Sequence, residues 1–146
     1  MPMKDLYLIA RLAGQRIALD AACIDSVVNV DGVTPVPMAP GHVTGLAALR
    51  SRVITIIDCR AALVLDAAPR ADVRRSVVVT LDGHQYGLVV DQVDDVCVIP
   101  GGAAPVRARL GRGWADAAHG MLDHAGESIL LLDPAALVRG PQARAA

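Results

Sequence analysis

The sequence contains no phenylalanine, and aromatic residues make up only 2% of it. It is nevertheless 53% hydrophobic, which excludes the composition of a disordered chain. The core must therefore be built from valine, isoleucine, leucine and alanine, and such small side chains suit tightly curved sheets. The 146 residues have the size of about one domain. A chain of this length should bury roughly 70% of its extended-chain surface on folding.

An excess of charge of either sign is also lacking. The formal net charge is −1, and no basic stripe is interleaved with aromatic residues, so nucleic acid is not an expected partner. No apolar run approaches the ~18 residues of a membrane span. The first five residues do not lead into a signal-peptide apolar region. We therefore expect a cytoplasmic protein with no direct membrane insertion.

Cysteine is scarce and does not pair by spacing. Cys23, Cys59 and Cys97 are an odd number, lie far apart and form no Cys-x-x-Cys motif. Each lies inside or beside an apolar segment. We expect small buried thiols in a reducing compartment; a disulfide or a reactive thiol is the alternative.

The first half of the chain is typical of short strands separated by turns. Two apolar runs form a hairpin around Gly14, a single helical turn follows at 21–24, and a short helix is expected at 60–65. Residues 31–41 carry three prolines and two glycines, which favours an ordered loop or a sheet edge, and 66–72 reads as a polar linker. The predicted strands are 6–12, 16–20, 25–30 and 53–57. The last of them, Val53–Ile57, is apolar on both faces and predicts a central strand buried on both sides.

The second half repeats this plan. At an offset of 69 residues Gly14, Ile17 and Leu19 fall on Gly83, Tyr86 and Leu88, and at an offset of 75 Gly45, Ile54, Ile56 and Asp58 fall on Gly120, Ile129, Leu131 and Asp133. The ordered offsets favour an internal duplication, although any two hairpins with glycine turns would align about as well. The Asp82-Gly83 pair is a strong hairpin signal, whereas the long connection 101–116 is the least predictable segment. About five strands in each half indicate one small barrel per half.

Four apolar residues occupy equivalent places in the two halves, each beside acidic residues at the start of a strand: Ile24, Val27, Val93 and Val96. Each of them fits either of two environments, the core or the wall of a groove where the halves meet. A groove with apolar walls and charged rims would accept a helical hairpin or another barrel.

Residues 45–60 resemble the signature of the CheW-like domain family. The matching positions are Gly45, Leu49, Arg50, Val53, Ile56, Ile57, Asp58 and Arg60. Ala48, Ser51 and Thr55 depart from it, since the family usually has asparagine, glycine and proline there. Residues 82–96 are similar to the family's second half, so the resemblance spans nearly the whole chain.

This resemblance implies an all-β, mainly β fold. Two pseudo-repeated five-stranded SH3-like barrels would pack together, with their central strands buried between them and short helices following those strands. The chain 1–146 would be a single CheW-like domain. We expect subdomain 1 at about 15–72 and subdomain 2 at about 73–133, with the N- and C-terminal segments packing across.

The resemblance also implies a non-catalytic chemotaxis adaptor without a cofactor or metal. Its partners would be the cytoplasmic tip of a methyl-accepting chemoreceptor and the regulatory domain of the CheA histidine kinase, and end-to-end barrel contacts would allow weak self-association. The implied receptor-binding residues are Ile24, Val27, Gly45, Arg50 and Gly120. No kinase-binding residue is assigned. Ser26 stands where many members carry a glutamate that can pair with the arginine, and Asp25 would point to the opposite face.

Signals for chemistry are weak. His42, His84, His119 and His124 form no metal-binding pattern, and no nucleotide or nucleophile motif is present. The carboxylates of Asp91, Asp94 and Asp95 suit either acid–base work or solvated strand faces. Arg50 and Arg52 near Asp58 suggest a phosphate clamp or, alternatively, ion pairs.

Two further hypotheses stay open. One is a divergent CheW-like regulator that binds a histidine kinase outside receptor arrays. The other is a small-molecule-binding or hydrolytic barrel, which would require Cys59, His124 and the aspartate cluster to converge.

Overall fold

The computed structural model describes residues 5–65 and 73–141, so the linker expected at 66–72 lies outside the described residues. The strands are β1 (Leu6–Leu12), β2 (Gln15–Asp20), β3 (Ile24–Asp31), β4 (Val43–Leu49), β5 (Arg52–Asp58), β6 (Val73–Leu81), β7 (His84–Val89), β8 (Gln92–Val98), β9 (Ala118–His124) and β10 (Glu127–Leu132). The helices are the 3-10 turn η1 (Ala21–Cys23) and the α-helices α1 (Cys59–Ala62), α2 (Arg112–Ala117) and α3 (Pro134–Arg139). The four strands predicted in the first half and the turns between them are confirmed. The helix expected at 60–65 is shorter and one residue earlier, and strand β4 was not predicted. Helix α2, within the least predictable connection, was not predicted.

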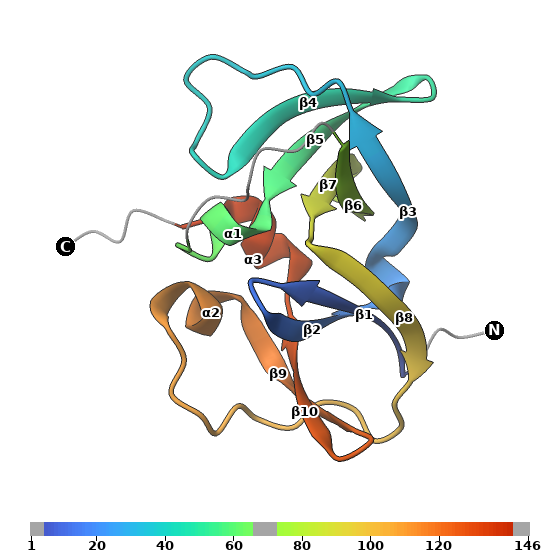
Figure 1. Ribbon diagram of the computed structural model, residues 1–146, viewed down its shortest axis with the longest axis vertical. Helices are drawn as coiled ribbons and strands as arrows, with labels where there is room; N and C mark the ends of the chain where they lie inside the picture. The colour runs from blue at the N-terminus through green and yellow to red at the C-terminus, as the bar shows by residue number, and fades with distance from the viewer. Residues whose placement is uncertain (1–4, 66–72, 142–146) are drawn as a thin grey trace.

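These strands form two five-stranded sheets that lie one above the other, with α1 and α3 between them (Figure 1). Barrel 1 has the strand order β3-β6-β7-β5-β4, and barrel 2 has the order β8-β1-β2-β10-β9. The prediction of a mainly β fold with two five-stranded barrels is therefore confirmed. No helix within the described ranges is both long and apolar enough to cross a membrane.

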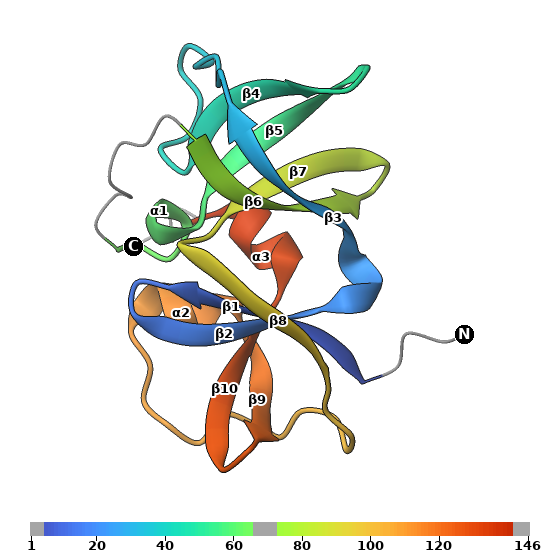
Figure 2. The ribbon, with the colours of Figure 1, turned by 45° about the vertical axis from the view of Figure 1, so that its right-hand side comes forward.

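The predicted subdomain boundaries, 15–72 and 73–133, are wrong. Strand β2 pairs with β1 and with β10 in barrel 2, whereas β6 and β7 lie in barrel 1. Each half of the chain thus gives its first hairpin to the other barrel, and Figure 2 shows β6 and β7 beside β3 and β5. The sequence pattern locates a hairpin because its turn is local, but it does not say which distant strand the hairpin pairs with.

The internal duplication is confirmed by this exchange. An offset of 69 residues places β1, β2 and β3 on β6, β7 and β8, and an offset of 75 places β4 and β5 on β9 and β10. When each strand is replaced by its equivalent, the strand order of barrel 1 becomes the strand order of barrel 2. Even the register is kept, since Leu130 lies opposite Ile17 in barrel 2 and Thr55 lies opposite Tyr86 in barrel 1. Each pair of parallel strands therefore occupies the same place in its barrel.

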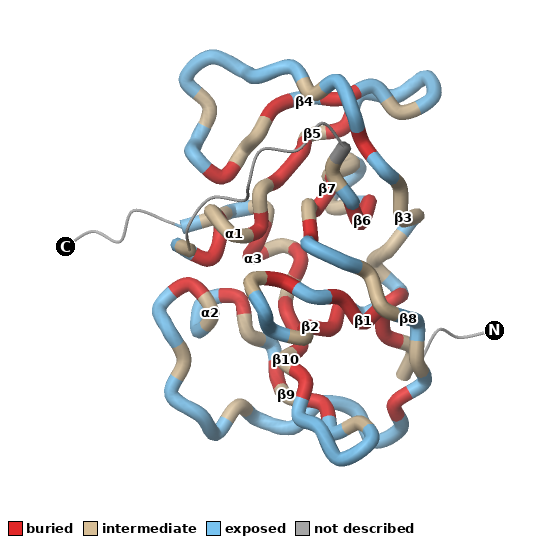
Figure 3. Tube along the Cα trace, in the orientation of Figure 1, coloured by how far each residue is buried: buried red, intermediate tan, exposed pale blue. Residues whose placement is uncertain are grey.

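Buried apolar side chains form three clusters, one inside each barrel and one shared between the barrels. Figure 3 shows buried residues along the strands of both sheets and on the helices between them. On β6, Val78 faces the interior of barrel 1, whereas Val77 and Val79 face the core shared between the barrels. Strand β1 does the same in barrel 2, with Ile9 inside the barrel and Leu8 in the shared core. The alternation has the period of two that a strand imposes.

Strand β5 is an inner strand, as predicted, because it pairs with β4 on one side and with β7 on the other. The predicted burial of both its faces is wrong, since Val53 is 66% exposed. Ile54 and Ile56 fill barrel 1, and Ile57 lies in the shared core. Burial on both sides therefore holds only at the Ile57 end, because the outer face of β5 runs beyond the shared core and reaches solvent at Val53.

A single pair of backbone hydrogen bonds connects the segment after β3 to β4 and so closes barrel 1. The Thr34 N–H donates to the Leu46 carbonyl oxygen, and the Leu46 N–H donates to the Thr34 carbonyl oxygen, each with a nitrogen–oxygen distance of 2.8 Å. Gly45, with a φ of +154°, makes this approach possible, since a Cβ there would lie 2.2 Å from the Thr34 carbonyl oxygen. Gly120 (φ +146°) plays the same part where Ala104 bridges β9 in barrel 2.

Aspartates cap the two helices that follow the last strand of each repeat. The Asp58 carboxylate accepts backbone N–H groups of Arg60 and Ala61 at the start of α1. The equivalent Asp133 accepts the Ala135 N–H at the start of α3. Such caps satisfy N–H groups that have no partner within the helix. The prediction of short helices after these strands is confirmed.

Candidate partner-binding site

The turn of the β4–β5 hairpin presents two arginines. Leu49 pairs with Arg52, so Arg50 and Ser51 form a two-residue turn, and Arg50 has a φ of +58°. A two-residue loop leaves the side chains at its start and end close together. Arg50, Ser51 and Arg52 are all exposed, so the hairpin presents two guanidinium groups at its tip.

Beside this turn lies a cavity of about 430 Å³, here called the hairpin pocket. Its apolar lining comes from strands β3, β4 and β6, and its polar lining from the hairpin turn, β3, β7 and the first residue of β5. The lining residues are Val27, Val28, Leu49 and Val78, and Asp25, Ser26, Arg50, Ser51, Arg52 and Gln85. An apolar floor with a few convergent polar groups is the usual character of a binding site.

The two arginines do not find an ionic partner among the described residues. Neither Arg50 nor Arg52 forms an ion pair or side-chain hydrogen bond with any residue in the described ranges, so the ion pairs expected as the alternative to a phosphate clamp are not found there. Asp58 caps α1 instead. Asp25, inside the hairpin pocket, accepts hydrogen bonds from Thr80 and from Gln85, the latter at 3.2 Å. Two unpaired positive charges at a concave apolar surface favour a partner that supplies negative charge.

The apolar positions predicted near the junction of the halves lie at the edge of the shared core. Ile24 and Val27 stand opposite Val79 and Val77 on the face of β3 that packs against this core, and both are half-buried. Val93 is also half-buried against the shared core. Val96 on β8 is 50% exposed. These residues thus border the junction of the barrels, and the structure gives each of them partial exposure.

The structure brings some of the predicted receptor-binding residues together and separates others. Val27 and Arg50 share the hairpin pocket, and Ile24 lies three residues before Val27 on the same strand. Gly45 and Gly120 instead sit at the closing bridges of the two barrels. The close packing at these bridges explains why glycine is needed at both positions, whether or not a partner binds there.

Sequence reasoning did not assign Arg52 or Leu49 to the site. The two-residue spacing between Arg50 and Arg52 was the available signal, because a tight hairpin turn places such residues at one tip. The apolar wall from Val28 and Val78 could not be found in this way, since it depends on the pairing of β3 with β6.

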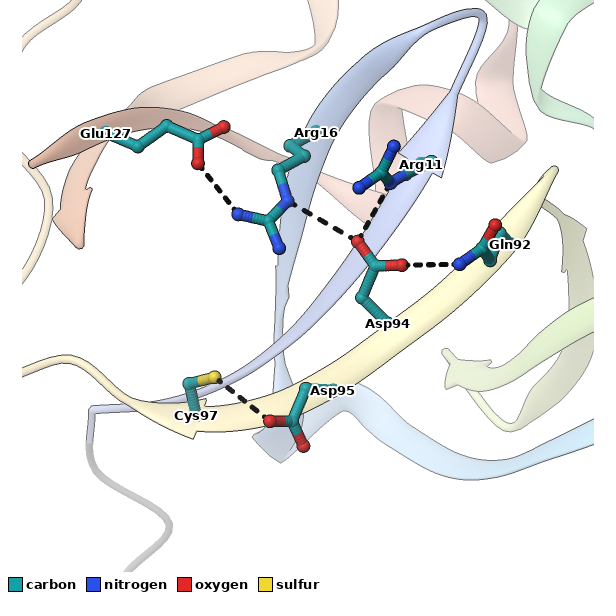
Figure 4. A network of polar contacts seen from close by, with 7 residues as sticks. All are labelled: Arg11, Arg16, Gln92, Asp94, Asp95, Cys97 and Glu127. Atoms are coloured by element: carbon teal, nitrogen blue, oxygen red, sulfur yellow. Dashed lines mark hydrogen bonds and ion pairs between the residues drawn. The ribbon is translucent and has the colours of Figure 1, made fainter. Parts of the chain in front are cut away.

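In the equivalent region of barrel 2, the charged side chains pair with one another (Figure 4). Asp94 accepts hydrogen bonds from Arg11 at 3.2 Å, Arg16 at 3.4 Å and Gln92 at 2.9 Å. Arg16 also pairs at 2.7 Å with Glu127, the only glutamate of the chain. Burial raises the pKa of the Asp94 carboxyl, but hydrogen bonds and charge from Arg11 and Arg16 outweigh it and hold this pKa below its ordinary value.

A second ion pair joins the two barrels. The Arg60 guanidinium, on α1, contacts Asp91 at 2.8 Å, and the same carboxylate accepts the Ala13 N–H at 2.9 Å from the β1–β2 turn. Burial raises the pKa of the Asp91 carboxyl. The hydrogen bonds from Arg60 and Ala13 and the charge of Arg60 have a larger, opposite effect, so this pKa lies below its ordinary value. Asp91 therefore ties α1 to barrel 2.

The residues named for a hydrolytic site do not converge. Cys59 is fully buried in the shared core, and burial, followed by the charges of Asp58 and Asp91, places the pKa of its thiol far above the ordinary value. His124 ends β9 at the outer hairpin of barrel 2 (Figure 1). Cys23 and Cys97 are half-buried rather than buried, and all three thiols are free. Among the described residues no group of three metal-ligating side chains could hold an ion.

The buried histidine has a structural role. His42 is 5% exposed, and its Nε2 lies 2.7 Å from the Val138 carbonyl oxygen in the last turn of α3. This contact ties the loop before β4 to a helix that packs in the shared core.

Comparisons with known proteins agree with this architecture. The chain is 28% identical to the chemotaxis protein CheW of Rhizobium meliloti (strain 1021) over 89 residues, which cover 61% of this chain and 57% of the relative. The matched segment thus spans little more than half the length of that relative. The crystal structure of the scaffolding protein TtCheW from Thermoanaerobacter tengcongensis has the same fold, with a TM-score of 0.79 and 22% identity over 91% of this chain and 90% of the other.

A family comparison covers more of the chain than either relative does. The CheW-like domain model matches residues 6–142, a range that includes both barrels, the hairpin pocket and all three α-helices. The predicted resemblance is therefore confirmed, and the chain belongs to the CheW-like domain family.

Proposed function

We propose that this protein is a non-catalytic adaptor in bacterial chemotaxis, which couples the cytoplasmic tip of a chemoreceptor to the regulatory domain of a CheA-type histidine kinase. The observation that carries the proposal is the hairpin pocket, where Arg50 and Arg52, which form no ion pair with the described residues, border an apolar wall. Membership of the CheW-like family and the similarity to a chemotaxis protein support the same function. The site of action is then the cytoplasm.

The receptor side of the proposal rests on the edge of barrel 1. Ile24 and Val27 give a partly exposed apolar strip along β3, and Arg50 stands at the hairpin turn beside it. A helical hairpin presents apolar side chains at intervals of three and four residues, which match an apolar strip of this kind. Arg50 would fix the orientation of the helix by pairing with a charged group at its edge.

A second partner needs a second surface, and the β4–β5 hairpin offers one on its opposite face. Leu46, which is 37% exposed, and Val53, which is 66% exposed, point away from the interior of barrel 1, as does the exposed Ala48. This outer face is separated from the hairpin pocket by the thickness of the sheet. We assign it to the kinase, whose regulatory domain would cover apolar residues that nothing covers in the isolated chain.

No step of this function requires a reaction. The aspartates with the strongest partners, Asp91 and Asp94, are held by arginines, and the Cys59 thiol is buried. The adaptor acts through binding alone, so its activity depends on two partners and their relative placement.

The test is a pull-down from lysate with the purified protein as bait, followed by mass spectrometry. A variant carrying Ile24→Asp and Val27→Asp places two charges on the apolar strip. A control carrying Val36→Asp and Val98→Asp makes the same changes at other exposed valines. Circular dichroism verifies that both variants are folded.

We expect the wild type and the control to retain a histidine kinase and a chemoreceptor, and the strip variant to lose the receptor alone. Recovery of kinase without receptor by the wild type would support a regulator that works outside receptor arrays. Recovery of neither partner would contradict the adaptor function.

A further inference from the structure

The internal duplication allows the hairpin pocket to be compared residue by residue with barrel 2. At the offset of 69, Asp25 corresponds to Asp94 and Gln85 to Arg16, and at the offset of 75, Arg52 corresponds to Glu127. The hydrogen bonds agree with this correspondence. Asp25 accepts from Thr80 and Gln85, just as Asp94 accepts from the equivalent Arg11 and Arg16.

The two barrels differ in the charges of the equivalent residues that surround these aspartates. In barrel 2, Arg16 lies between two carboxylates, 3.4 Å from Asp94 and 2.7 Å from Glu127, and the charges alternate. In barrel 1, the neutral Gln85 takes the middle position, and Arg52 stands where barrel 2 has its glutamate. Gln85 already donates to Asp25 and cannot neutralise a guanidinium group. Arg52 therefore forms no ion pair with any residue that the structure describes.

The turn adds to this imbalance. Arg50 occupies the position of Ala125, so barrel 1 has two unpaired guanidinium groups where barrel 2 has none among the equivalent residues. Both line the hairpin pocket beside the apolar Val27 and Leu49. A guanidinium group binds a carboxylate through two parallel hydrogen bonds, and such pairs are stronger than neutral ones.

We propose that Arg52 binds a carboxylate of the chemoreceptor, an aspartate or glutamate side chain that completes in barrel 1 the ion pair that Glu127 completes in barrel 2. The inference rests on the proposed function and specifies the chemistry of the receptor surface. On a helix, residues three or four positions apart share a face. The receptor helix therefore carries an aliphatic residue one turn from the acidic one, and that residue packs against Val27 and Leu49.

Asp25 restricts the ligand to a single negative charge. Its carboxylate lines the same pocket and is held there by Thr80 and Gln85. A phosphate or a nucleic-acid backbone would bring more negative charge against it, and like charges at close range are unfavourable. One carboxylate between Arg50 and Arg52, with aliphatic carbon beside it, matches both the charges and the apolar wall.

The experiment measures binding of a purified receptor cytoplasmic fragment, taken from the same organism, to the intact protein by titration calorimetry at two salt concentrations. The variant Arg52→Glu reverses the charge. A double variant, Arg52→Glu with Gln85→Arg, rebuilds the alternating charges of barrel 2 inside barrel 1. The control Arg107→Glu makes the same charge change at an exposed arginine far from the pocket in sequence.

We expect Arg52→Glu to weaken receptor binding at least tenfold and to reduce its salt dependence, while the control stays within twofold of the wild type. The double variant should match or exceed the wild type in thermal stability and still bind the receptor weakly. An acidic-to-lysine scan of the receptor fragment should yield a variant that restores binding to Arg52→Glu.

The outcomes separate this inference from the function on which it rests. Wild-type binding together with unchanged binding by Arg52→Glu overturns the inference and leaves the adaptor function standing. The same titration with the kinase regulatory domain tests the partner: loss of kinase binding by Arg52→Glu with receptor binding retained overturns the assignment to the receptor. Absence of receptor binding by the wild type overturns both.

Discussion

Replacing Gly45 by alanine tests whether this glycine is a structural residue or a contact for a partner. A Cβ at Gly45 would lie 2.2 Å from the Thr34 carbonyl oxygen, 2.7 Å from the Thr34 carbonyl carbon and 3.0 Å from Pro35 Cα. All three are backbone atoms, so the closing segment must move. The two hydrogen bonds between Thr34 and Leu46 would then be lost or lengthened.

The expected cost has two parts. A non-glycine residue at this positive φ is strained by about 1–3 kcal/mol, and two lost hydrogen bonds cost about 0.5–1.5 kcal/mol each. The free energy of unfolding should therefore fall by roughly 2–6 kcal/mol. At about 2–4 °C per kcal/mol for a chain of this size, the Tm should fall by at least about 4 °C.

Gly120→Ala is the matched variant, because its Cβ would meet the Ala103 Cβ at 2.7 Å and the Ala104 carbonyl oxygen at 3.0 Å. These contacts are less severe, so the loss should be smaller than at Gly45. Urea denaturation and a thermal melt measure both variants. An unchanged Tm for Gly45→Ala, together with lost receptor binding, would refute the structural role and support a direct contact.

Three further predictions concern stability and reactivity. Asp91→Asn should lower the free energy of unfolding at pH 7 by about 1 kcal/mol, since the variant loses the charge that pairs with Arg60. Because the folded-state pKa of Asp91 lies below the ordinary 3.8, its contribution is present above about pH 4 and is lost as the pH falls through the folded-state value. In urea denaturation, the difference in free energy of unfolding between the two proteins should therefore be smaller at pH 3 than at pH 7. An equal difference at both pH values would contradict this. Cys59 should resist iodoacetamide at pH 8 in the native state and react only on unfolding, as peptide mapping would show, whereas rapid labelling would mean that the shared core opens. Ile57→Ala should cost about 2–5 kcal/mol and Val53→Ala less than about 0.5 kcal/mol, and equal losses in denaturation would contradict the observed alternation of β5.

Local features of this fold could be predicted from the sequence because their causes are local. The hairpin at Asp82-Gly83 follows from a turn that needs positive φ at both residues, and both have it. The helix after β5 follows from an aspartate that can cap it. The duplication was visible because equivalent turns and strands recur at fixed offsets.

The exchange of hairpins could not be predicted. Strand β2 pairs in parallel with β10, more than 100 residues later, and nothing in either strand's own pattern states this preference. The exposure of Val53 has the same origin, because it depends on how far the shared core extends along β5.

For the candidate site, the sequence located Val27 and Arg50, which share the hairpin pocket. It gave no sign that Arg52 forms no ion pair with the described residues, since the contrast with the equivalent Glu127 is visible only when barrel 1 is compared with barrel 2. The resemblance assigned Gly45 to the same surface, whereas its contacts with Thr34 explain its presence at a closing bridge.

The most direct test of the adaptor function is cosedimentation of the purified histidine kinase with membranes that contain the chemoreceptor, with and without this protein. We predict that the kinase pellets with the membranes only when the protein is present. The Arg50→Ala variant should still bind the kinase but no longer carry it to the membranes. Equal sedimentation of the kinase in the absence of the protein, or none in its presence, would contradict the account.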